Sequence, residues 1–154
     1  MELSVITVNI NDKENMLNQV ESVRLAADGV VYEQIISDNG SSDNSIAEIR
    51  ARYPEVKIVE NSKNIGFGAA NNNAFNISTG EFVLCLNPDM RLVPGSLKIL
   101  LDWMRVHKEV GIVSPKLVDE KGVFNEGAKP RRFPRLIDQV AILLKLPHLF
   151  PHVL

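Results

Sequence analysis

Short apolar runs alternate with segments of helical spacing through most of the chain. Residues 3–10 (LSVITVNI) form a β-branched apolar run, which is typical of a strand covered on both faces. Apolar residues then recur at helical spacing between positions 16 and 25. The alternation continues and predicts strands at 34–38, 56–59, 81–86 and 110–114 and helices at 45–53, 69–77 and 97–106. Strands that alternate with helices of this length predict βαβ units, and therefore an α/β fold with a mainly parallel sheet.

The alternation of predicted strands and helices ends after Ser114. Residues 116–124 predict a hairpin, and a basic, proline-broken loop follows at 129–135. The pattern at 136–146 predicts an amphipathic helix that packs on a further domain, mediates a homodimer or makes peripheral contact with a membrane. The sequence leaves these three alternatives open.

Polar residues follow each of the first four predicted strands. They are Asn9 and Asn11, Asp38 to Asp43, Asn61 to Asn64, and Asn87 with Asp89. The carboxyl ends of parallel strands lie at one edge of a sheet, where ligands of α/β proteins bind. The sequence therefore predicts one ligand-binding site formed by these strand ends.

Composition narrows the class of protein. The chain of 154 residues is 45% hydrophobic and 23% charged, which is typical of a globular domain with an apolar core. The net charge is −2, and lysine and arginine form no stripe along a predicted element. Nucleic acid is therefore not the expected partner, because binding to phosphates requires clustered positive charge.

The single cysteine and the apolar runs predict the compartment. Cys85 lies in the apolar run 82–86, which predicts a buried thiol, and a lone cysteine forms no intramolecular disulfide. The N-terminus lacks the basic and apolar regions of a signal peptide. The late apolar run at 140–144 is far shorter than the ~20 residues that cross a bilayer. These features predict a cytoplasmic protein.

Four motifs in register resemble family 2 glycosyltransferases of the GT-A fold, most closely the bacterial rhamnosyltransferase-like branch. The motifs are SVITVNIN, SDNGSSDNS, NSKNIGFGAANNNA and LNPDM, within residues 3–135. The resemblance implies inverting transfer of a sugar from a UDP- or dTDP-sugar to a saccharide or lipid-linked acceptor, in cell-surface polysaccharide synthesis at the inner face of the membrane. It makes residues 1–115 a nucleotide-sugar-binding α/β domain, which residues 116–154 continue.

The resemblance also implies roles for individual residues. Asp38 hydrogen-bonds the base of the nucleotide. Asp89 matches the last aspartate of the family's DXD motif, in which Asn87 replaces the first, and is the ligand of Mg²⁺ or Mn²⁺. The full predicted nucleotide-sugar-binding set is Thr7, Asn9, Asp38, Asn39, Asn64, Gly66, Phe67, Gly68, Asn71, Asn72, Asn87 and Asp89.

Structural interpretations stay open for part of this set. Asn39 begins an ordinary turn composition, Asn71 and Asn72 suit a helix surface, and Asp89 suits the cap of a turn. Asp43 is expected to cap the helix that follows it.

The glycine-rich segment 64–71 also suggests a dinucleotide site. It lacks the third glycine of that motif and follows the third strand rather than the first, which disfavours a nicotinamide-dependent oxidoreductase. Arg131, Arg132 and Arg135 either contact a diphosphate or lipid-linked acceptor or form a solvated loop.

The catalytic base is not identified from the sequence. In the family it lies in an acidic motif well beyond the fifth strand, and Glu126 falls too early to match it. The resemblance therefore predicts the donor-binding part of the enzyme, truncated before the acceptor half. The alternative is a non-catalytic module that binds a nucleotide without transferring a sugar.

Overall fold

The computed structural model describes residues 1–119 and 121–125. The chain forms two compact units, Met1–Val113 and Ser114–Leu154. The predicted basic loop with Arg131, Arg132 and Arg135, the predicted helix at 136–146 and Glu126 lie outside the described residues. The predicted division at residues 115 and 116 stays a prediction.

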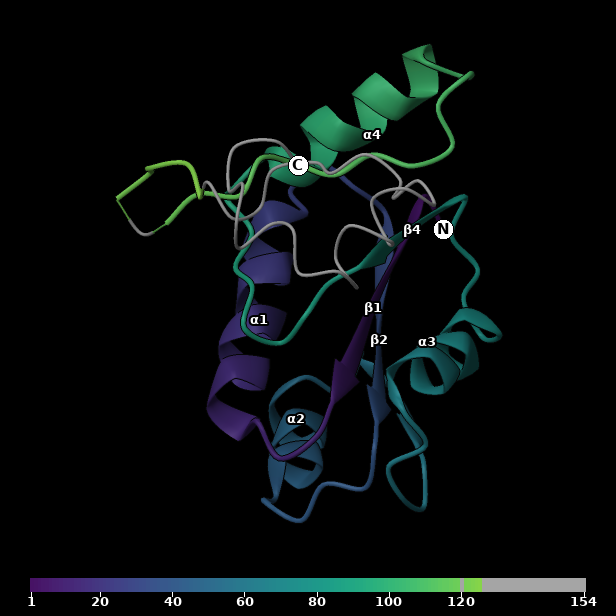
Figure 1. Cartoon of the computed structure of the whole chain (residues 1–154), viewed down its shortest axis with the longest axis vertical. Coiled ribbons are helices and arrows are strands. Elements are labelled where there is room, and N and C mark those ends of the chain that lie inside the picture. Colours follow the sequence, from purple (N-terminus) through teal and green to yellow (C-terminus); the bar gives the residue numbers. More distant parts are fainter. Residues whose placement is uncertain (120, 126–154) are drawn as a thin grey trace, which may run out of the picture. The chain divides into compact units, whose positions relative to one another are not determined.

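The first unit is built on a four-stranded parallel sheet in the order β3-β2-β1-β4 (Figure 1). Its strands are β1 (Leu3–Asn9), β2 (Tyr32–Asp38), β3 (Lys57–Glu60) and β4 (Phe82–Cys85). Its helices are α1 (Lys13–Ala26), α2 (Ser45–Arg52), α3 (Phe67–Phe75) and α4 (Ser96–Val106). These elements confirm the predicted α/β fold, with element ends displaced by a few residues.

The two central strands explain the continuous apolar run at the start of the sequence. β1 pairs with β2 on one side and with β4 on the other, in a register that aligns Asn9 with Asp38 at the carboxyl end. Six of its seven residues are buried. A strand that is central in a parallel sheet is covered on both faces, and its residues are therefore apolar at successive positions.

Helices α1, α2 and α4 cover one face of the sheet. Leu3 and Val5 of β1 pack with Val23 of α1 and with Leu97 and Leu101 of α4. Next to them, a second cluster joins Ile36 of β2 to α1 and α2, through Met16, Val20, Ile46 and Ile49. Burial of each of these side chains contributes roughly 1.5–3 kcal/mol to folding before entropy is subtracted.

Helix α3 covers the opposite face (Figure 1), where Ala74 packs against Ile6 of β1 and Ile35 of β2. Cys85 of β4 is aligned with Ile6 and so lies on this same face. The thiol residue is nevertheless exposed, so the predicted burial of Cys85 is wrong. The physical reason is its place in an edge strand, since α3 packs on β1 and β2.

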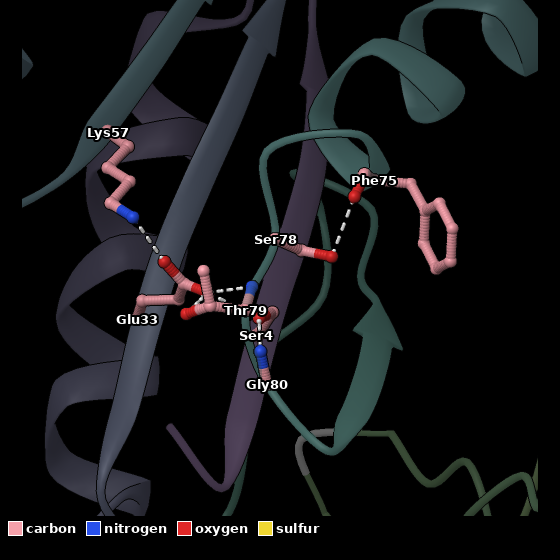
Figure 2. Close-up of polar contacts among 7 residues, drawn as sticks. All are labelled: Ser4, Glu33, Lys57, Phe75, Ser78, Thr79 and Gly80. Carbon is pink, nitrogen blue, oxygen red and sulfur yellow. Dashed lines mark hydrogen bonds and ion pairs between the residues drawn. The ribbon is translucent and has the colours of Figure 1, made fainter.

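A buried glutamate ties the α3–β4 connection to the amino-terminal end of the sheet (Figure 2). Glu33 of β2 is 6% exposed, and its Oε1 accepts hydrogen bonds from the Ser4 hydroxyl at 2.6 Å and from the Thr79 amide at 2.6 Å. Its Oε2 accepts a hydrogen bond from Lys57 Nζ at 2.6 Å. Burial alone would raise the pKa of Glu33, but the bonds from Lys57, Ser4 and Thr79 outweigh burial and lower the pKa to about 2.

The same connection requires a glycine. The Gly80 amide donates to the Ser4 hydroxyl at 2.8 Å, as Figure 2 shows. A Cβ atom at position 80 would lie 2.5 Å from the Ser4 nitrogen and 2.7 Å from the Leu3 carbonyl carbon. The chain therefore enters β4 by close backbone approach to β1, which only glycine permits.

The predicted strand at 110–114 is wrong. This segment pairs with no strand in the part of the chain that the structure describes, and Ile112 is 91% exposed. An apolar run becomes a strand only where a neighbour accepts its backbone hydrogen bonds and covers its side chains. In the second unit, by contrast, Val118 forms an antiparallel bridge with Phe124, which confirms the predicted hairpin.

Candidate functional site

A cleft of about 280 Å³ lies at the carboxyl ends of the strands. Its lining comes from the segments after all four strands and consists of Val8, Ile10, Asp12, Asn39, Asn64, Phe67 and Pro88. Three of the predicted site residues, Asn39, Asn64 and Phe67, thus meet in one cleft. Pro88 brings the loop of Asn87 and Asp89 to the same place.

The cleft combines apolar walls with a small number of polar groups. Phe67 begins α3 and is 62% exposed, so its ring is available to a ligand. Asp12 is the one charged residue in the lining, which contains no lysine or arginine. A flat ring with polar edges matches this lining better than an isolated phosphate does, because phosphates are bound mainly by cationic groups and backbone amides.

Asn39 and Asn64 are held together by their side-chain amides. Asn39 Nδ2 donates to Asn64 Oδ1 at 3.2 Å, and Asn64 Oδ1 also accepts from the Gly66 amide at 2.9 Å. Gly66 has a φ of +88°, which favours glycine, and it places its amide toward Asn64 at the start of α3. The loop between β3 and α3 is thereby anchored to the end of β2.

Two further asparagines underlie this pair. Asn61 Nδ2 donates to the Ser37 hydroxyl and the Asp38 carbonyl oxygen, both at 3.0 Å, and to Asn39 Oδ1 at the longer distance of 3.3 Å. Asn73 of α3 donates from Nδ2 to Asn61 Oδ1 at 2.8 Å. The predicted nucleotide-sugar-binding set contains neither Asn61 nor Asn73, although Asn61 is among the polar residues that follow the third predicted strand.

The Asp38 side chain does not line the cleft, and its carboxylate is hydrogen-bonded to other groups of the protein. The residue is 4% exposed. Its Oδ1 accepts from Asn9 Nδ2 at 3.0 Å and from the Ser41 hydroxyl at 2.5 Å, and its Oδ2 accepts from the amides of Gly40 at 3.1 Å and Ser41 at 2.8 Å. A carboxylate has about four acceptor positions, and all of them are used here. The side chain therefore fixes the turn that carries the chain from β2 to α2.

Thr7 and Asn9 are fully buried on the face of the sheet that α1 and α2 cover. The Thr7 hydroxyl accepts from Gln19 Nε2 of α1 at 2.7 Å. Asn9 Nδ2 donates to Asp38 and also to the Ser45 hydroxyl at 3.0 Å. Their side chains do not line the cleft, because successive residues of β1 point to opposite faces and Val8 takes the cleft side.

Asp43 joins the starts of two helices. Its Oδ1 accepts from the Ser45 amide of α2 at 3.0 Å, although the N-cap position of that helix is Asn44, and its Oδ2 accepts from the Lys13 amide of α1 at 2.9 Å. Burial opposes ionisation of Asp43, but the hydrogen bonds from Ser45 and Lys13 prevail and lower its pKa. Both loops beside the cleft are therefore held by one carboxylate.

The remaining predicted residues surround the cleft without lining it. Asn71 Nδ2 donates to the Phe67 carbonyl at 3.0 Å, one turn earlier in α3, and Asn72 is exposed. Gly68 lies in the first turn of α3, where a Cβ would meet no atom within 4 Å. The hydrogen bond of Asn71 agrees with its interpretation as a helix-surface residue. Direct contact of Gly68, Asn71 or Asn72 with a ligand stays a prediction.

Asn87 and Asp89 are both exposed in the loop after β4. Arg91 braces this loop by donating to the Pro88 carbonyl at 2.9 Å and to Asn15 Oδ1 of α1 at 3.0 Å. Within residues 1–119 and 121–125, no three histidine, cysteine, aspartate or glutamate side chains gather as a metal site. Mg²⁺ is commonly held by one or two carboxylates together with substrate phosphates, so Asp89 fits a cation that a diphosphate also ligates.

Comparison with known proteins shows the family to which the chain belongs. Residues 4–153 match the sequence profile of the family described as Glycosyl transferase family 2. The N-acetylglucosaminyl-diphospho-decaprenol L-rhamnosyltransferase of Mycobacterium tuberculosis is 29% identical over 147 residues, which cover 88% of this chain and 47% of that protein. The chain thus spans about half the length of this curated relative.

Solved structures share the fold. S. aureus TarS 1-349 in complex with UDP-GlcNAc matches 70% of this chain and 32% of its own, with a TM-score of 0.61 and 25% identity. The mannosyltransferase PcManGT from Pyrobaculum calidifontis, in complex with GDP-Man and Mn²⁺, matches 67% of this chain and 32% of its own, with a TM-score of 0.60 and 20% identity. In the described part of this chain, no helix has the length and hydropathy that a membrane span requires.

Proposed function

This chain belongs to glycosyl transferase family 2 and has the GT-A fold, and on that premise we propose that its cleft binds a nucleotide diphosphate-sugar. One observation carries the proposal: the segments after all four strands meet in a single cleft with apolar walls and polar edges. Parallel α/β sheets bind nucleotides at this edge. The complexes of TarS with UDP-GlcNAc and of PcManGT with GDP-Man support a donor of this class.

In the proposed complex, the nucleobase lies against the apolar wall that includes Phe67. The diphosphate extends toward the loop of Asn87 and Asp89, where Asp89 and the phosphate oxygens hold Mg²⁺ or Mn²⁺. A divalent cation there offsets the negative charge that develops on the departing diphosphate. The Mn²⁺ of the PcManGT complex supports the use of such an ion.

Asp38, Asn9 and Thr7 act on the donor through the backbone that they position. Asp38 meets a ring N–H of the base directly only if one of its four internal donors releases it. Gly66 and Gly68 allow the start of α3 to approach the nucleotide closely, and Asn71 and Asn72 lie on the same helix.

The proposed reaction is an inverting sugar transfer. An acceptor hydroxyl attacks the anomeric carbon from the face opposite to the diphosphate, while a carboxylate base takes the hydroxyl proton. The residues that surround the cleft bind the donor in this proposal, and no residue is assigned as the catalytic base. The name of the M. tuberculosis relative supports rhamnose as the sugar and a lipid-linked acceptor. We further propose a dTDP- or UDP-sugar as the donor and polysaccharide synthesis at the inner face of the membrane as the role.

Calorimetric titration of the full chain with UDP, dTDP and GDP, with and without Mn²⁺, tests donor binding. We expect Mn²⁺ to strengthen binding, and Asp89→Ala to remove the effect of Mn²⁺ and weaken binding by about tenfold or more. Asp28→Ala, an exposed aspartate in the turn after α1, is the matched control and should bind as the wild type does. Equal affinity and equal Mn²⁺ dependence in Asp89→Ala would contradict the assignment of Asp89.

A second measurement separates an enzyme from a binding module. Slow hydrolysis of a UDP- or dTDP-sugar, or transfer to an added acceptor, indicates the enzyme. Mn²⁺-dependent nucleotide binding with no turnover of any donor indicates the non-catalytic alternative.

A further inference from the structure

Four asparagines form a hydrogen-bonded relay beneath and beside the cleft, in the order Asn73, Asn61, Asn39 and Asn64. We infer that this relay sets the base specificity of the cleft. It favours a nucleobase with a carbonyl oxygen at C4 of a pyrimidine or C6 of a purine, as in uracil, thymine and guanine, over one with an amine at that position, as in cytosine and adenine. The inference rests on the proposed function and names the chemistry of its donor.

Backbone groups beside Asn61 and Asn64 fix the direction of the amides in the relay. Asn61 faces the Asp38 carbonyl, which only accepts, so the group that Asn61 presents there is Nδ2. Asn64 faces the Gly66 amide, which only donates, so the group that Asn64 presents there is Oδ1. Asn39 lies between them and must present its oxygen to Asn61 and its nitrogen to Asn64.

The relay leaves only donors for a ligand. Asn39 Oδ1 accepts from Asn61 Nδ2 at 3.3 Å and from the Ile65 amide at 3.4 Å. Asn64 Oδ1 accepts from Asn39 and from Gly66. Each carbonyl oxygen has two lone pairs, and both oxygens are therefore filled. The N–H groups that remain on the two lining residues require acceptor atoms in the ligand.

A nucleobase fits this wall of the cleft and supplies those acceptors better than a phosphate does. The lining contains Val8, Ile10, Phe67 and Pro88 and no cationic side chain. Apolar faces of this kind suit a flat ring, and amide N–H groups at its edge suit a ring carbonyl. An exocyclic amine at the same place would leave donors facing donors, which is the arrangement that discriminates strongly between related ligands.

Asn61 is the position from which the relay is tested, because it does not line the cleft. Asn61→Asp keeps the shape and replaces the donor by a carboxylate, which would face Asn39 Oδ1 at the present 3.3 Å. Asn39 is then expected to rotate and turn its oxygen toward Asn64 and the cleft. The matched control is Asn18→Asp, which makes the same chemical change at an exposed position of α1.

The experiment measures dissociation constants for UDP and CDP on the full chain, with folding checked by thermal unfolding. We expect the wild type and Asn18→Asp to prefer UDP by about tenfold or more, and Asn61→Asp to lower that ratio to about threefold or less. If Asn61→Asp does not fold, Asn39→Asp introduces an acceptor at the lining position itself and should lower the ratio in the same way. Binding of UMP and uridine reports how much of the affinity for UDP the phosphates contribute.

The outcomes separate this inference from the proposed function. A wild type that binds no nucleoside diphosphate overturns both. A wild type that binds UDP and CDP equally, or folded variants that keep the wild-type ratio, overturn the relay alone and leave the donor site standing. A reduced ratio in Asn61→Asp with unchanged Asn18→Asp supports the relay, because a merely structural defect would weaken UDP and CDP alike.

Discussion

Asn9 and Asp38 end neighbouring strands in aligned positions, and Asn9 Nδ2 donates to Asp38 Oδ1 across 3.0 Å on the buried face of the sheet. The two residues follow the central strands at the edge where the cleft lies, yet neither side chain lines that cleft. Their pairing instead holds the end of β1 to the turn after β2. The strand ends that border the cleft are thus kept in place by polar contacts on the opposite face.

Asp38→Asn tests this supporting role. The variant replaces one of the two accepting oxygens by an NH₂ group, so either the Gly40 and Ser41 amides or Asn9 Nδ2 and the Ser41 hydroxyl lose their acceptor. We expect a loss of about 2 kcal/mol in the free energy of unfolding, measured by urea denaturation. Asp28→Asn, at an exposed turn, should cost far less. Unchanged stability with lost nucleotide binding would instead identify Asp38 as a direct contact of the base.

Glu33→Gln should destabilise the protein in a pH-dependent manner. At neutral pH the variant loses the charge that receives hydrogen bonds from Lys57, Ser4 and Thr79, at an expected cost of about 2 kcal/mol. The folded-state pKa of about 2 lies below the ordinary value of 4.5, so this stabilisation is complete above pH 4.5 and is lost as the pH falls toward 2. Denaturation curves of both proteins across this range should therefore converge at low pH. A constant difference would show that ionised Glu33 is not the cause.

Among the glycines that the structure describes, Gly80→Ala should be the most damaging substitution, because its Cβ would meet backbone atoms of β1 at 2.5 and 2.7 Å. Backbone atoms cannot move aside as the end of a side chain does, and we expect a loss of roughly 3 kcal/mol in thermal or urea unfolding. Gly111→Ala serves as the control, since its Cβ would meet no atom within 4 Å. Similar stability of the two variants would contradict the close approach at Gly80.

The fold was predictable because its strongest signals are local. The β-branched run of β1 and the helical spacing of α1 and α4 depend on neighbours in sequence, and each lies where it was predicted. The prediction of a strand at 110–114 was wrong because apolar character alone does not provide a strand to pair with. The prediction that Cys85 is buried was wrong because the sequence does not reveal that β4 is an edge strand. Helix α3 leaves the Cys85 side of this strand uncovered.

The candidate site was predictable only in outline. Polar residues after parallel strands located the cleft, but a strand covered on both faces does not reveal which face holds the ligand. Thr7 and Asn9 therefore entered the predicted set, although Val8 lies on the cleft side. Asn61 bonds across 22 residues to Asn39 and across 12 residues to Asn73, and no spacing rule connects such positions.

Because Cys85 is exposed, its thiol can report whether another polypeptide covers β4. It is the single thiol of the chain, and it lies on the outer face of β4. The rate at which a maleimide alkylates it would record, without any engineered label, whether another polypeptide rests on that face. Protection of Cys85 in a longer polypeptide or in a complex would map the covered edge of the sheet in one mass-spectrometric measurement.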